Sequence, residues 1–169
     1  QGKYDEAERV FRRVLAFLEG AVVPDYALSR SVLSDLGGVL SHQGKDEEAE
    51  PLYRRAIAIG ETVLGAQHPD LIEDLDHLAA GLNKQEKFHD AEAIYRKVLV
   101  IKEKSLGHDH PDLANSINNL AESLRDQDKD AEAESLYRWA ISIEKIGRGI
   151  NHPRFAAALS NMARIYRDQ

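Results

Sequence analysis

The sequence predicts an all-α solenoid of about eight helices in antiparallel pairs, and three observations carry this prediction. The chain of 169 residues repeats with a period of 42 residues, and a fixed period of a few tens of residues is typical of solenoids. Each period holds two stretches whose apolar residues follow the three-and-four spacing of a buried helical stripe. Glycine and proline separate these stretches at constant positions, where helices end and begin.

The period appears as columns of identical residues. Four or more copies occur in the Gln, Lys, Ala and Arg columns: Gln1, Gln43, Gln85, Gln127 and Gln169; Lys3, Lys45, Lys87 and Lys129; Ala7, Ala49, Ala91 and Ala133; Arg12, Arg54, Arg96 and Arg138. Small residues also recur in the second stretch of each period, at Gly37, Ala79, Ala121 and Ala163. A large side chain at these positions would force paired helices apart, so we expect these columns to mark close helix packing.

The expected elements follow in order along the chain. A single helix occupies 1–20, complete helix pairs occupy 25–63, 69–105 and 111–147, and a last helix occupies 153–168. Between the helices of successive periods, Gly65, Gly107 and Gly149 predict left-handed C-terminal caps, and Pro69, Pro111 and Pro153 follow at the first helical position.

The first period departs from this pattern. Gly20 and Pro24 keep their mutual spacing but lie three residues early. We infer that the helix before them is shorter by about one turn and the helix after them longer by about one turn.

Composition excludes several classes of function. The net charge of −7 argues against non-specific binding to nucleic acid. The chain has no cysteine, which excludes thiolate metal sites and cysteine nucleophiles. No apolar run approaches the roughly 18 residues of a membrane span, and we expect a cytoplasmic protein. The charge is −1, −5, −2 and +1 over 1–42, 43–84, 85–126 and 127–168, so a partner could be bound in one orientation.

The repeat resembles the tetratricopeptide repeat family, in its longer kinesin-light-chain-like type. The resemblance is carried by Leu64–Leu71 and Leu106–Leu113, which read LGxxHPDL, by Asn118–Ala121, and by Gln43–Ile57. It implies a right-handed superhelix in which the first helix of each repeat (A) lines a concave face and the second (B) lies outside. It also implies that ligands are extended peptides or short helices of partner proteins.

Matching the A helices to the family pattern identifies candidate partner-binding residues. The central column is Asp35, His77, Asn119 and Asn161, and the next column is Ser34, Asp76, Asn118 and Ser160. One turn further lie Gly38, Ala80, Glu122 and Arg164, with Asn83, Arg125 and Arg167 at the edge and Glu73 and Asn115 at the start. From these we select Asp76, His77, Asn115, Asn118, Asn119, Glu122, Arg125, Asn161 and Arg164. Asparagine suits main-chain recognition because its amide both donates and accepts hydrogen bonds; the alternative is a solvated polar face.

Some tetratricopeptide modules clamp a C-terminal carboxylate with Lys, Arg and Asn residues, and this sequence does not match that set. Acidic Asp35, Glu73 and Asp76 lie where the first two A helices would meet such a ligand, and they would repel it. We expect a ligand that is basic toward these helices and acidic or neutral toward Arg125, Arg164 and Arg167.

Neither a metal site nor an enzyme is expected. His108, Asp109 and His110 could suggest a metal, but His68, His110 and His152 recur before proline and predict a structural role at the helix start. The Glu8 column predicts ion pairs with the Arg12 column at i, i+4. Trp139 suggests either a second contact surface or a ring folded over a neighbouring helix, and we favour the second.

The sequence therefore predicts a protein-interaction scaffold without cofactor, metal or chemistry of its own. The alternative is a self-assembly or regulatory segment of a larger protein. Neither end looks like a polar cap, and Phe155, Leu159, Met162 and Ile165 of the last helix lack a following helix to cover them. Either the natural protein continues beyond both ends, or the ends stack end to end on other molecules.

Overall fold

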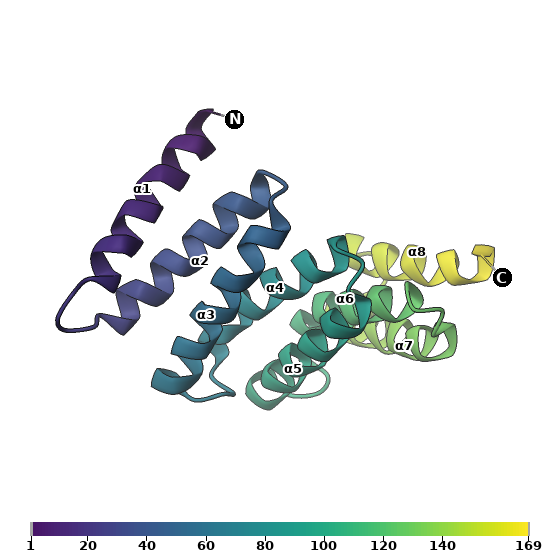
Figure 1. Cartoon of the computed structure of the whole chain (residues 1–169). Coiled ribbons are helices and arrows are strands. Elements are labelled where there is room, and N and C mark those ends of the chain that lie inside the picture. Colours follow the sequence, from purple (N-terminus) through teal and green to yellow (C-terminus); the bar gives the residue numbers. More distant parts are fainter. Residues whose placement is uncertain (1, 169) are drawn as a thin grey trace. The chain divides into compact units, whose positions relative to one another are not determined.

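Helices account for all the regular secondary structure of residues 2–168, the part of the chain that the computed structural model describes, apart from the side chains of Ile165 and Asp168. The eight α-helices are α1 (Gly2–Glu19), α2 (Tyr26–His42), α3 (Asp46–Leu64), α4 (Ile72–Lys84), α5 (Phe88–Leu106), α6 (Ala114–Arg125), α7 (Asp130–Gly147) and α8 (Pro153–Asp168). Two 3-10 turns, η1 (Pro69–Leu71) and η2 (Pro111–Leu113), precede α4 and α6. The predicted all-α class and the number of helices are confirmed (Figure 1).

The chain forms two compact units, Gln1–Lys87 (unit 1) and Phe88–Gln169 (unit 2). In unit 1, α1 packs on α2, α2 on α3 and α3 on α4; in unit 2, α5 packs on α6, α6 on α7 and α7 on α8. The A helices are α2, α4, α6 and α8, and the B helices are α1, α3, α5 and α7. Each unit therefore contains its own alternation of A and B helices.

The small-residue columns lie where the helices approach closely. Ala49, Ala91 and Ala133 of the B helices and Ala79 and Ala121 of the A helices are at most 1% exposed. These positions confirm the prediction of close packing for the inner repeats, whereas Ala163 on α8 is exposed and Ala7 on α1 is half-buried.

Gly37, the glycine among these small positions, lies at a tight helix contact. A Cβ added to Gly37 would lie 2.9 Å from the ring of Tyr53 on α3, so α2 and α3 meet at a distance that only glycine permits. Its neighbour Gly38 has more space, since the nearest atom to an added Cβ is the Tyr53 hydroxyl at 3.8 Å.

The turns between repeats have the residues that their backbone requires. Gly65, Gly107 and Gly149 have φ values of +96°, +89° and +87°, which favour glycine. Gly65 has a ψ of 149°, so the prediction of a left-handed helical cap is wrong at this residue. The backbone instead enters an extended region with positive φ that is essentially restricted to glycine.

The recurring histidine before proline caps the following turn. The Nδ1 atoms of His68, His110 and His152 accept hydrogen bonds of 3.2 Å from the main-chain N–H groups of Asp70, Asp112 and Arg154. This confirms the structural role that the sequence predicted.

The shifted boundary in the first repeat is also confirmed. Helix α1 ends at Glu19, whereas α3 ends at Leu64, which is position 22 after subtracting one period of 42 residues. Helix α2 has 17 residues against 13 in α4, because its start is a regular helical turn capped by Asp25 rather than a 3-10 turn. Asp25 Oδ1 accepts a hydrogen bond of 2.9 Å from Leu28 N–H.

Between residues 2 and 168, none of the helices combines the length and the apolar character that a bilayer crossing requires.

Candidate functional site

The recurring charged residues of the B helices and their turns make the contacts that build the repeat. The i, i+4 pairs predicted from the sequence are present at 2.5–3.0 Å: Glu8–Arg12, Glu50–Arg54, Glu92–Arg96 and Glu134–Arg138. The recurring lysine of the next repeat then binds the same glutamate: Lys45–Glu8 at 2.9 Å, Lys87–Glu50 at 2.8 Å and Lys129–Glu92 at 2.7 Å. The sequence showed that these lysines recur but did not identify their partners.

Glu92 is the most strongly stabilised of these carboxylates. Burial alone would raise its pKa, but hydrogen bonds from Lys129, Arg96 and Gln127 outweigh burial and lower the pKa from 4.5 to about 2. Lysine contacts likewise lower the pKa values of Glu8 and Glu50. The recurring glutamates of the B helices thus use their charge in contacts within the protein.

The A helices differ because much of their polar surface is not used in packing. In unit 2, α6 and α8 hold seven of the nine selected residues: Asn115, Asn118, Asn119, Glu122, Arg125, Asn161 and Arg164. Asn115 is exposed, and Asn118 and Asn119 are half-buried. The buried Oδ1 of Asn118 has no hydrogen-bond partner among the described residues.

Helices α6 and α8 are joined across this face by side chains. Arg164 Nη2 donates to Glu122 Oε1 and, over 3.1 Å, to Asn161 Oδ1. Arg125 pairs with its neighbour Asp126 at 3.1 Å. Asn161, Glu122 and Arg164 therefore form one connected polar cluster, and Arg125 lies in a separate pair.

The remaining two selected residues, Asp76 and His77, lie on α4 in unit 1. Asp76 is half-buried and His77 is exposed. The His77 ring lies against Tyr53 of α3, with 5.6 Å between ring centroids.

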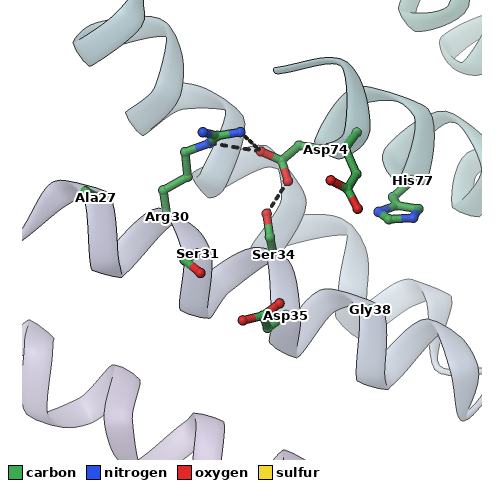
Figure 2. A pocket seen from close by; sticks show the side chains of 9 residues that line it. Ala27, Arg30, Ser31, Ser34, Asp35, Gly38, Asp74 and His77 are labelled. Carbon is green, nitrogen blue, oxygen red and sulfur yellow. Dashed lines mark hydrogen bonds and ion pairs between the residues drawn. The ribbon is translucent and has the colours of Figure 1, made fainter. Parts of the chain in front are cut away.

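Unit 1 also contains a pocket of about 340 Å³ between α2 and α4, which we call the acidic pocket. It is lined by Ala27, Arg30, Ser31, Ser34, Asp35, Gly38, Glu73, Asp74 and His77. The central column of the A helices, represented here by Asp35 and His77, thus lies on a hollowed surface, as drawn in Figure 2.

One wall of the acidic pocket is a partly buried ion pair that sequence analysis did not predict. Arg30 of α2 contacts Asp74 of α4 at 2.9 Å, and the side chain of Asp74 is only 4% exposed. Ser34, which lies in the column next to the central one, donates a hydroxyl hydrogen bond to Asp74, and the convergence of Arg30 and Ser34 on one carboxylate is visible in Figure 2. Arg30 and Asp74 are 44 residues apart, so no local pattern could have paired them.

A second hollow of about 220 Å³, which we call the tyrosine pocket, adjoins the acidic pocket. It is lined by Gly38, Ser41, His42, Tyr53, His77, Ala80, Gly81 and Lys84. Gly38 and His77 line both pockets, and we refer to the two adjoining pockets together as the groove along α2 and α4.

Trp139 folds onto the preceding repeat, as favoured from the sequence, but its neighbour is a histidine ring rather than a long aliphatic stem. The rings of Trp139 and His108 are stacked with centroids 4.5 Å apart. His108 Nδ1 also contacts Glu103 Oε1 at 2.7 Å. Among the described residues there is no group of three His, Cys, Asp or Glu side chains that could hold a metal ion.

Comparisons with known proteins agree on the fold. A family model described as Tetratricopeptide repeat matches residues 1–62, 28–99 and 71–146. A search of the curated proteins found no match.

Three solved structures illustrate the similarity of fold. A putative kinesin light chain with nearly identical TPR-like repeats from Podosopora anserina is 22% identical, with 98% of this chain and 79% of that chain covered and a TM-score of 0.86. BtubC (BKLC) from P. vanneervenii is 19% identical, with 98% and 66% covered and a TM-score of 0.83. The TPR domain of Arabidopsis FLU is 15% identical, with 72% and 98% covered and a TM-score of 0.62.

Proposed function

Because the chain belongs to the tetratricopeptide repeat family, in its kinesin-light-chain-like type, we propose that it is a protein-interaction scaffold that binds a peptide or helical segment of a partner on its A helices. Repeats of this family generally mediate protein–protein contacts and are generally non-enzymatic. A cytoplasmic location is part of the proposal.

One observation carries the proposal: the two kinds of helix use their polar residues differently. The recurring Glu and Arg residues of the B helices pair within each helix, and the recurring Lys residues pair with the Glu of the preceding repeat. On the A helices, Asn119 is half-buried and His77 exposed, and neither hydrogen-bonds to another described residue. Asparagine offers two donors and an acceptor to a ligand main chain, so these faces support peptide recognition.

A peptide-display selection on the full chain tests this function. Peptides enriched on the wild type should lose binding to Asn119→Arg, because the larger charged side chain would occupy the α6 face. The matched control is Ala93→Arg, which adds the same side chain at an exposed position of the B helix α5 and should leave binding within about twofold. Circular dichroism should show the same helicity for all three proteins.

Two outcomes would contradict the proposal. Either the selection enriches no peptide over a blank surface, or the enriched peptides bind Asn119→Arg as well as the wild type and lose binding to Ala93→Arg.

A separate variant tests the role of Asn119 itself. If Asn119→Ala unfolds the chain, then Asn119 is structural and its assignment to a binding face is wrong.

The second candidate function is self-assembly, which is favoured by exposed apolar residues on the first and last helices. Phe17 and Val10 on α1 are 77% and 52% exposed, and Leu159 on α8 is 43% exposed. Phe155 and Met162 are half-buried, whereas the side chain of Ile165 lies outside what the structure describes. Contacts between these helices of two copies would bury the apolar area.

Light scattering over a hundredfold range of concentration tests the second candidate. Self-assembly predicts a mass that rises with concentration for the wild type and stays at one chain for Phe17→Ser combined with Leu159→Ser. A constant wild-type mass of one chain would exclude this candidate and leave the scaffold proposal untouched.

A further inference from the structure

The groove along α2 and α4 of unit 1 is acidic at one end and uncharged in its middle. It runs from Ala27 near the start of α2, through the acidic pocket and the tyrosine pocket, to Lys84 at the end of α4. Lys84 is paired with Asp46 at 3.2 Å. The A-helix stretch from Ala27 to His42 is about 22 Å long at 1.5 Å per residue, which matches an extended segment of about seven residues.

The acidic end contains more negative charge than its own residues neutralise. Arg30 is committed to Asp74, whereas Asp35 and Glu73 are exposed and make no ion pair or hydrogen bond with other described residues. Two carboxylates therefore face an open pocket without a counter-charge. A cationic side chain entering the pocket would gain from both and would displace no internal partner.

The tyrosine pocket supplies a second and independent indication of a ligand. Tyr53 is 2% exposed. Its hydroxyl lies within reach of the Ser41 side chain, but it makes no hydrogen bond of ordinary geometry to another described residue. The small residues Gly38, Ala80 and Gly81 line the hollow beside it. A buried hydroxyl without a partner is costly, and a ligand main chain that passed over these small residues could satisfy it.

We propose that unit 1 binds an extended segment of a partner protein through one arginine or lysine, which enters the acidic pocket while small residues beside it lie over the Tyr53 hydroxyl. The inference rests on the scaffold function and adds the chemistry of the partner. A segment that ends in a free carboxylate, or that carries acidic residues at this position, would be repelled by Asp35 and Glu73.

Nuclear magnetic resonance titration of the full chain tests the proposal with two synthetic peptides. The probe is the blocked peptide Ser-Gly-Ala-Arg-Ala-Gly-Ser, and its control has citrulline in place of arginine, which has a similar shape but no charge. We expect the arginine peptide to shift the amide signals of Asp35, Gly38, Glu73 and His77 and to bind at least fivefold more tightly than the citrulline peptide. The difference should shrink at high salt because the carboxylates are exposed.

Charge-neutralising variants distinguish the effect of the pocket carboxylates on binding from the effect of the net charge of the chain. Asp35→Asn with Glu73→Gln should weaken binding of the arginine peptide at least fivefold. Glu6→Gln with Glu47→Gln removes the same charge from exposed positions outside the groove and should change binding less than twofold. Equal affinities for the two peptides, or equal effects of the two double variants, would overturn the proposal.

Tyr53→Phe tests the second contact. The variant should unfold at the same temperature as the wild type or higher, because it removes a buried hydroxyl without a partner, and it should bind the arginine peptide two- to fivefold more weakly. Unchanged binding would exclude the hydroxyl from recognition. If these titrations fail while display-selected peptides remain sensitive to Asn119→Arg, then only this inference is wrong; if both fail, the scaffold function is wrong as well.

Discussion

At the scale of single residues, Glu92 shows how burial and charge compete at one carboxylate. Its pKa of about 2 lies below its ordinary value of 4.5, so the ionised form is stabilised by folding. The resulting stability is fully present above about pH 4.5 and is lost as the pH falls toward 2. It amounts to roughly 3 kcal/mol, since one pKa unit corresponds to about 1.4 kcal/mol and solvent screens little of the effect at a side chain that is only 11% exposed.

Glu92→Gln should therefore destabilise the chain at pH 7 by up to about 3 kcal/mol, and the difference from the wild type should shrink at pH 3. Chemical denaturation at the two pH values measures this. The control is Glu6→Gln, which changes an exposed carboxylate. This variant should have the same free energy of unfolding as the wild type at both pH values. A difference that grows at pH 3 would contradict the assignment.

A second residue-scale effect is the strained turn residue Glu86. Glu86 has a φ of +60° and lies one period after Gly44, whose φ is +77°. A side chain in this left-handed region costs roughly 1 kcal/mol. Glu86→Gly should accordingly raise the free energy of unfolding by up to about 1 kcal/mol, although the added backbone freedom of glycine offsets part of the gain.

The reciprocal change Gly44→Ala should lower the free energy of unfolding by about 1 kcal/mol, because an added Cβ meets no atom within 4 Å and only the backbone strain remains. Thermal unfolding of Glu86→Gly and Gly44→Ala measures the change in melting temperature that each substitution causes. The explanation fails if both substitutions shift the melting temperature in the same direction.

At the scale of helices, the packing of α2 on α3 depends on one of two adjacent glycines. Gly37→Ala should destabilise the chain by about 1–2 kcal/mol, because the new Cβ would lie 2.9 Å from the Tyr53 ring and overpacking outweighs the better helix propensity of alanine. Gly38→Ala meets its nearest atom at 3.8 Å and should be neutral or stabilising by up to about 1 kcal/mol.

Chemical denaturation of the two variants compares identical substitutions at neighbouring positions. Equal effects would show that α2 and α3 can separate at little cost, which would contradict the close approach of the two helices.

At the scale of the whole molecule, the division into two units predicts how the chain tolerates cutting. Each unit has four helices that pack in sequence and its own buried residues, and repeat proteins derive their stability from individual repeats and neighbouring interfaces. Fragments 1–87 and 88–169 should each remain helical by circular dichroism and melt cooperatively. A fragment without a thermal transition would show that its fold requires the other unit.

The sequence alone determined the repeat and its helices. The repeated helices are specified by local signals, namely the spacing of apolar residues and the positions of glycine and proline, and these signals act within a few residues. For this reason the sequence predicted the helix class, the short α1, the longer α2 and the capping role of His68, while one local detail, the cap geometry at Gly65, differed.

Only the tertiary structure decided which side chains meet. Lys45 binds Glu8 across 37 residues and Arg30 binds Asp74 across 44, because helix pairing brings positions of adjacent repeats together. The same pairing leaves Asp35 and Glu73 without partners in a pocket. Local periodicity specifies which face of a helix is buried, but partners and cavities depend on how one repeat is stacked on the next.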